Sequence, residues 1–271
     1  MPHRKHLISS QKRLRYRFLT LLAIALLPGL GACAQAPADP AAHAAFEERN
    51  DPIEPANREV FAFDQFLDKH TMKPLARAYR DYVPEFVQNR LHDFLANLQA
   101  PVIEINDQLQ GNVTRGWVTF ERFAVNTTVG GLGLFDVASD WNLPFHDADY
   151  GQTLGVWGVA AGPYVVLPFL GPSNARDAVG TGLGFFLDPL GFVGGTNTLY
   201  AGYARGAANA VDDRADQIDS LDALEADAID FYAKMRSAYG QHRALVVAQG
   251  VAGKDDVDTA SSSDATALAD P

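Results

Sequence analysis

The sequence predicts a mostly α-helical single domain, and three observations carry this prediction. Apolar side chains recur at helical spacing through most of residues 51–250. The flanking segments differ in composition, since residues 34–50 are rich in Ala and Pro, and residues 254–271 are rich in Ser, Ala and Asp. The centre carries closely spaced glycines, which indicate connecting loops with tight bends. We therefore divide the chain into residues 1–32 (a signal peptide), 33–50 (a flexible tether), 51–250 (amphipathic helices joined by glycine-rich loops) and 251–271 (a disordered tail).

The N-terminus has the layout of an export signal. Six Lys and Arg side chains precede an apolar run over 18–30, and small residues follow it. The run is shorter than the roughly 20 apolar residues that a membrane-spanning helix needs. It ends in Leu-Gly-Ala-Cys at 30–33, which resembles a bacterial lipobox, and Cys33 is the only cysteine of the chain. We expect Cys33 to carry lipid and to begin the mature protein; the rival is an unlipidated signal peptide cut near Ala32. Ala34, in place of an aspartate, favours the outer membrane.

The mature chain is strongly acidic. Removal of residues 1–32 leaves 16 Lys and Arg against 33 Asp and Glu, a net charge of −17. Such a surface argues against nucleic-acid binding and against electrostatic docking on anionic lipid. With a single cysteine, no intramolecular disulfide can form.

The residue pattern in the first half of the domain predicts three helices. One covers 55–68, the next begins at Pro84 and is stopped by Pro101, and the third ends at Gly130-Gly131. Their apolar faces contain Val60, Phe63 and Leu67 in the first, Val87, Leu91, Phe94, Leu95 and Leu98 in the second, and Trp117, Phe120, Ala124 and Thr127 in the third.

The second half predicts a short extended piece and two further helices. Val165–Leu167 is bracketed by prolines, and Ser173 is placed to cap a helix that begins at Asn174 and ends at Pro189. One long apolar stripe runs over 218–235. Its opposite side carries Asp219, Asp222, Asp227 and Asp230, which we interpret as a solvated face; contact with a partner protein is the alternative.

The residues alone favour a protein that is not an enzyme. No Gly-x-Ser-x-Gly, His-Glu-x-x-His or phosphate-binding loop occurs. The nearest reactive cluster is Asp140, His146, Asp147 and Asp149, which we interpret as a solvated polar loop, since a metal site of this type usually needs more nitrogen or sulfur ligands. Ser139 stands beside this cluster without an oxyanion-hole signature. We expect no cofactor and no metal, and keep an envelope lipid hydrolase and a structural envelope anchor as alternative functions.

A series of ordered motifs resembles the MlaA (VacJ) family of outer-membrane lipoproteins over about residues 51–250. The motifs include Asp51-Pro52-x-Glu54-x-x-Asn57-Arg58, Arg122-Phe123-x-x-Asn126-Thr127, Gly151-Gln152-Thr153-Leu154-Gly155, Gly162-Pro163-Tyr164-x-x-Leu167-Pro168 and Gly171-Pro172-Ser173-x-x-Arg176-Asp177.

The resemblance implies a fold, a function and partners. The fold is a helical ring embedded in the inner leaflet of the outer membrane around a central amphipathic channel, often beside a trimeric porin. The function is removal of mislocalised phospholipid from the outer leaflet and its transfer to a periplasmic lipid-carrier protein, which maintains outer-membrane lipid asymmetry.

The resemblance also implies roles for individual residues. Cys33 takes the lipid anchor. Asp64 departs from the asparagine usual in the family, and a carboxylate there weakens contact with a polar head group. Ordinary helix packing is the alternative for the two phenylalanines, and a plain helix end for the glycines. The lipid-path candidates are Asn57, Phe61, Phe63, Asp64, Gly130, Gly131 and Gly133, and the gating-loop candidates are Leu143, Phe145, Asp147 and Tyr150.

Overall fold

The computed structural model describes residues 50–189 and 195–253. Cys33, the signal peptide, nearly all of the tether and most of the tail lie outside these residues. The elements are α3 (Glu54–Leu67), the π-helix η2 (Asp68–Met72), α4 (Lys73–Tyr82), α5 (Glu85–Leu109), α6 (Val113–Thr128), α7 (Val137–Asp140), α8 (Tyr150–Val156), β1 (Tyr164–Leu167), β2 (Gly171–Asn174), α9 (Ala175–Leu187), α10 (Gly195–Asp216), α11 (Ile218–Ala226) and α12 (Phe231–Ala252).

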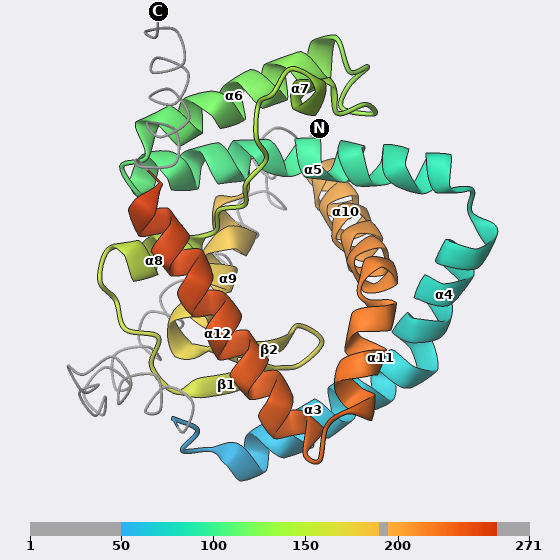
Figure 1. The fold of residues 1–271 in the computed structure, drawn as a ribbon, viewed down its shortest axis with the longest axis vertical. Helices are drawn as coiled ribbons and strands as arrows, with labels where there is room; N and C mark the ends of the chain where they lie inside the picture. Colours follow the sequence, from blue (N-terminus) through green and yellow to red (C-terminus); the bar gives the residue numbers. More distant parts are fainter. Residues whose placement is uncertain (1–49, 190–194, 254–271) are drawn as a thin grey trace, which may run out of the picture. The chain divides into compact units, whose positions relative to one another are not determined.

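The described residues form a mostly helical single domain, as the sequence predicts. The most extensive helix contact joins α5 to α6, which lie side by side in Figure 1. A closed circuit of contacts links α5, α8, α12, α11 and α10, since each helix contacts the next and α10 returns to α5. β1 and β2 form an antiparallel hairpin in which Tyr164 pairs with Asn174 and Leu167 with Gly171. The extended piece predicted at Val165–Leu167 is therefore confirmed.

The first predicted helix is confirmed and continues further. α3 begins with Pro55 in its first turn and passes through η2 into α4 without leaving helical geometry. The chain turns extended at Val83, because the following Pro84 disfavours helical geometry in the residue before it. The aromatic core lies beside α3, where Phe61 packs with Tyr164, Val166 and Tyr232.

The predicted stop at Pro101 is wrong. α5 runs from Glu85 through Pro101 to Leu109, so the proline lies inside the helix. Proline removes the backbone donor that would reach the carbonyl of Asn97. The side chains of Ile103, Asn106 and Asp107, beyond the proline, are nevertheless fully or almost fully buried. Packing of this last part of α5 therefore outweighs the local preference of proline.

Two other boundaries differ from the predictions. The cap of α9 is Asn174, whose Oδ1 accepts a hydrogen bond from the Asp177 N–H at 2.8 Å; Ser173 belongs to β2. The single apolar stripe predicted over 218–235 belongs to two helices. α11 ends at Ala226, and Asp230 caps α12 by accepting a hydrogen bond from the Ala233 N–H. α12 continues to Ala252, beyond the predicted boundary at 250.

The acidic side of 218–235 is paired within the chain, while Asp219 and Asp227 stay exposed to solvent. Its carboxylates contact basic side chains of α3, α4 and α12. These pairs tie α11 and the start of α12 to the N-terminal helices. The contacts are Asp219 with Arg80 (3.2 Å), Asp222 with Lys73 (2.5 Å), Asp227 with Lys234 (2.6 Å) and Asp230 with Arg58 (2.6 Å).

Within residues 50–189 and 195–253, no helix is both long enough and apolar enough to cross a bilayer.

Candidate functional site

A cavity of about 190 Å³ lies between α5, α6 and the 143–150 loop. Its apolar wall includes Ile103, Phe123 and Phe145. Its polar wall includes Asn97 and Arg122, both almost completely buried. The lining of this hollow is therefore mixed, with surfaces that suit hydrocarbon and others that suit a polar or charged group.

A buried carboxylate holds the 143–150 loop against α5. His146 Nε2 lies 2.8 Å from Oδ2 of Asp107, which is 0 % exposed. The Thr119 hydroxyl donates to the same oxygen at 3.0 Å. Oδ1 of Asp107 is buried and has no hydrogen-bond partner among the described residues. The contact joins a loop residue to the C-terminal end of α5 and, through Thr119, to α6.

Arg122 of α6 fixes the start of the same loop. Its guanidinium donates to both oxygens of Asp136 at 2.9 Å and to the backbone carbonyl of Leu143. It also lies 5.5 Å from the centre of the Phe145 ring. Burial raises the pKa of Asp136, but hydrogen bonds from Ser139, Asn126 and Arg122 outweigh it, so the pKa stays below its usual value.

A second cavity, of about 380 Å³, lies on the other side of the loop residues Phe145 and His146, which line both hollows. It is more polar and is bounded by Arg115, Asp147, Asp149, His242 and Arg243. The two loop side chains therefore stand between an amphipathic cavity and a polar one.

The predicted glycines form the turn after α6. Gly133 has φ +90°, and a Cβ on it would come within 2.6 Å of the Asn97 side chain. Only glycine allows both this conformation and this approach. Gly130 and Gly131 precede it, and Gly131 also has positive φ (+64°). The turn thus packs directly against a residue of the amphipathic cavity.

The candidates on α3 lie elsewhere, beside the hairpin. Asn57 is 2 % exposed, and its amide donates to the Tyr164 carbonyl (3.0 Å) and accepts from the Val166 N–H (3.0 Å). Phe61 belongs to the aromatic core, while Phe63 is half-exposed and meets Phe169 edge-on at 5.7 Å. The predicted residues therefore form two groups. The candidates on α3 lie at the β1–β2 hairpin, whereas the glycine turn and the 143–150 loop lie at the amphipathic cavity.

Asp64 gives a stability prediction. Its Oδ1 accepts from the Phe169 N–H at 2.9 Å, and burial raises the pKa of its carboxyl. A folded-state pKa above the unfolded value of about 3.9 means that the contribution of Asp64 to stability is complete below that pH and is lost as pH rises through the folded value. D64N keeps the acceptor and removes the charge, so it should raise the free energy of unfolding slightly at pH 7 and flatten this fall. Urea unfolding from pH 4 to 7 measures it; an unchanged pH profile in D64N would contradict the assignment.

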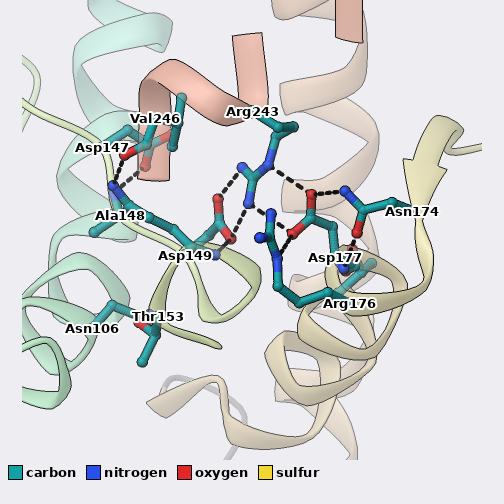
Figure 2. Close-up of polar contacts among 12 residues, drawn as sticks. Asn106, Asp147, Ala148, Asp149, Thr153, Asn174, Arg176, Asp177, Arg243 and Val246 are labelled. Carbon is teal, nitrogen blue, oxygen red and sulfur yellow. Dashed lines mark hydrogen bonds and ion pairs between the residues drawn. The ribbon is translucent and has the colours of Figure 1, made fainter. Parts of the chain in front are cut away.

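The far end of the loop enters a buried ionic network (Figure 2). Arg243 of α12 donates to Asp149 Oδ2 at 2.6 Å and to Asp177 Oδ2 at 2.8 Å. Asp177 also accepts from Arg176 (2.8 Å), Asn174 (2.7 Å) and Tyr239 (2.7 Å). Burial opposes ionisation of Asp177, but its donors hold its pKa below the usual value. The network joins α8, α9 and α12, and Asp149 caps α8 immediately before Tyr150.

Ser139 and His146, the residues of the hydrolase alternative, contact different partners. The Ser139 hydroxyl donates to Asp136 at 2.5 Å and accepts from Arg122, whereas His146 contacts Asp107 and Thr119. Asp149, predicted to be solvated, pairs with Arg243. The serine and the histidine thus serve two different carboxylates, and this arrangement does not form a serine–histidine pair.

The sequence patterns predict no role for the polar side chains that line the amphipathic cavity. The signal for them was a polar residue on the buried face of a helix, as at Asn97, Thr119 and Arg122. Buried polar groups are retained where they find partners, so such positions point to a built network.

The fold and its amphipathic cavity define a helical protein suited to ligands with a polar and an apolar end. The family model for MlaA lipoprotein matches residues 49–245, and the chain belongs to this family. A Rickettsia felis protein is 37 % identical over 195 residues, which cover 72 % of this chain and 76 % of that protein. The intermembrane phospholipid transport system lipoprotein MlaA of Haemophilus influenzae is 33 % identical over 75 % of this chain and 81 % of its own length.

The Escherichia coli protein of the same name is 42 % identical over 133 residues, 48 % of this chain and 53 % of its own length. A solved structure described as a structural basis for maintenance of bacterial outer membrane lipid asymmetry has a TM-score of 0.64 and 33 % identity. The likeness covers 73 % of this chain and 100 % of that one. The family is one of transport lipoproteins rather than enzymes.

Proposed function

We propose that this chain is an outer-membrane lipoprotein of intermembrane phospholipid transport, which maintains lipid asymmetry by removing phospholipid from the outer leaflet. The observation that carries the proposal is the family match over residues 49–245. The amphipathic cavity adds physical support, because it offers an apolar wall and a polar wall to one ligand.

The helices are proposed to form a ring around an amphipathic channel in the inner leaflet of the outer membrane. The closed circuit of contacts from α5 through α8, α12, α11 and α10 supports a ring. Half-exposed aromatic side chains support burial in acyl chains, among them Trp117 and Phe120, whose ring centres are 5.4 Å apart on α6. A channel with a polar wall is needed because an unpaired phosphate in hydrocarbon costs many kcal/mol.

The 143–150 loop is proposed to be the gate of this channel. Phe145 and His146 line both cavities, so their displacement would join the two. The loop is held by Arg122 at Leu143, by Asp107 at His146 and by Arg243 at Asp149. These three contacts use side chains of α5, α6 and α12, so a shift among these helices would move the loop. Gly133 packs on Asn97, which lines the amphipathic cavity.

Attachment and partners complete the proposal. Cys33 would carry the lipid anchor. A periplasmic carrier would receive the phospholipid, and a trimeric porin would hold the protein beside it. Phe63 and Asp64 on α3 remain candidates for contact with lipid, because Phe63 is half-exposed.

Deletion of the gene should leave excess phospholipid in the outer leaflet, because nothing would remove it. Surface labelling of phospholipid and sensitivity to detergent measure the effect, and the wild-type gene supplied in trans should restore both. An outer leaflet that is unchanged on deletion, in a strain without a redundant system, would refute the function.

Complementation with F145A tests the gate within the same experiment. Phe145 is 57 % exposed, so its loss should cost little stability, yet it separates the two cavities. We expect F145A to restore the outer leaflet incompletely. F185A is the matched control, because Phe185 is 72 % exposed on α9 and lines neither cavity. Full restoration by F145A would contradict a gating role for Phe145. Fatty-acid release by the purified protein would favour a hydrolase.

A further inference from the structure

A histidine and two aspartates from two helices meet where α5 contacts α10, and the histidine, His92, also lines the amphipathic cavity. His92 lies on α5, and Asp212 and Asp216 lie one turn apart on α10. One potential ligand atom of each lies within 4.8 Å of the other two. In the described part of the chain this is the one group of three His, Cys, Asp or Glu side chains with such spacing.

We propose that His92, Asp212 and Asp216 bind a divalent transition-metal ion of the Zn²⁺ type, which clips α10 to α5. An imidazole nitrogen with two carboxylate oxygens suits such an ion better than Mg²⁺ or Ca²⁺, which prefer oxygen ligands throughout. Water would complete a tetrahedral coordination, because His92 and Asp216 are exposed.

The geometry of the site needs little change to accept the ion. His92 Nδ1 is 2.8 Å from Asp212 Oδ2, a contact that a shared proton fills. Two ligands of one tetrahedral Zn²⁺ lie about 3.3 Å apart. The side chain of His92 is 56 % exposed and so is free to rotate by the small amount required. The ion would replace the proton between the two groups.

Asp212 is already held as a metal-binding carboxylate would be. It is 5 % exposed, and its second oxygen, Oδ1, accepts a hydrogen bond from the Tyr79 hydroxyl of α4 at 2.9 Å. Metal-binding carboxylates and imidazoles are generally oriented by such outer hydrogen bonds. Through Tyr79 the ion would tie α4 as well as α5 to α10.

The charge around the site is also unbalanced. Asp212 has only the histidine as an ion-pair partner, and Asp216 has none among the described residues. Asp213 lies between these two aspartates in the sequence and adds a carboxylate that has no ion-pair partner among the described residues. The neighbouring carboxylates have their own cations: Asp68 with Arg214 (2.7 Å), Asp93 with Arg90 (2.9 Å), Asp219 with Arg80 (3.2 Å) and Asp222 with Lys73 (2.5 Å). A divalent cation would neutralise the excess negative charge at this site.

The test is titration calorimetry of the mature, untagged lipoprotein in detergent with ZnCl2, after removal of metals by a chelator. The wild-type chain should bind one Zn²⁺, and its midpoint of thermal unfolding should rise with Zn²⁺. D216N and H92A should each weaken binding by about tenfold or more and abolish the rise in the midpoint. D213N and H242A are the controls, since each makes the same substitution at an exposed residue outside the three ligands. H242A should bind as the wild type does, and D213N, which only removes a nearby negative charge, should lose much less affinity than D216N.

Three results would overturn the proposal. The first is a wild-type chain that takes up no Zn²⁺ when the ion is in large excess. The second is equal affinity in D216N and D213N, which would place the ion elsewhere. The third is displacement of Zn²⁺ by a comparable concentration of Mg²⁺, which would contradict the ligand chemistry. The experiment contains no phospholipid substrate, so its outcome is independent of the transport function.

Discussion

D177A should be the most destabilising loss of a charged side chain in this domain. Asp177 is buried and accepts hydrogen bonds from Arg176, Arg243, Asn174 and Tyr239. Its removal leaves Arg176 without its carboxylate partner and separates Arg243 from α9, two contacts that Figure 2 shows. Removal of one partner from a buried ion pair costs about 3–5 kcal/mol, because the remaining charge stays desolvated. We expect a loss of that size in the free energy of unfolding at pH 7, measured by guanidinium chloride unfolding with circular dichroism.

D219A is the matched control for this change. Asp219 also pairs with an arginine, Arg80, but its side chain is 88 % exposed, and surface pairs contribute about 0–1 kcal/mol. Equal effects of D177A and D219A would show that the buried network contributes no more than a surface pair.

The effect of D177A should also depend on pH with a definite sign. The donors around Asp177 hold its folded-state pKa below the unfolded value of about 3.9. The contribution of its charge is therefore complete above that pH and is lost as pH falls through the folded value. The difference between D177A and the wild type should shrink in acid. A difference that grew in acid would contradict an ionised Asp177 in the fold.

The helical faces of the domain were predictable because they follow the 3.6-residue period. The helix around Phe63, the turn after α6 and the short strand at Tyr164 are where the sequence places them. Residue patterns failed where tertiary packing overrides local preference. The sequence predicts that Pro101 ends the helix, but packing of the buried side chains beyond Pro101 keeps the chain helical to Leu109.

The candidate site was predictable only in part. The family resemblance pointed to the loop and the glycine turn; Phe145 of the loop lines the amphipathic cavity, and Gly133 of the turn packs against Asn97, which also lines it. It also grouped Asn57 with them, although Asn57 lies by the hairpin and satisfies backbone groups of β1. His146 and Asp107 are 39 residues apart. No local pattern predicts such a contact, because it depends on how α5 and α6 pack.

G180A should separate two helices whose backbones are in direct contact. A Cβ at Gly180 of α9 would lie 2.2 Å from the backbone nitrogen of Gly151 and 2.5 Å from its Cα, in α8. Backbone atoms cannot rotate away as a side chain can, so α8 and α9 would have to move apart. We expect a loss of about 3 kcal/mol or more in the free energy of unfolding, the upper range for an overpacked core. Urea unfolding of the mature protein measures it.

G182A tests whether this loss comes from contact rather than from the substitution itself. Gly182 lies two residues further along the same helix, and a Cβ there would meet nothing within 4 Å. Alanine is the better helix former by about 1 kcal/mol, so G182A should be neutral or stabilising. Because α8 begins at Tyr150, where the 143–150 loop ends, the displacement in G180A should reach the proposed gate. G180A should therefore also impair complementation of the lipid phenotype at temperatures where it remains folded, whereas G182A should complement fully. Equal stability of the two variants would mean that α8 and α9 do not pack this closely in solution.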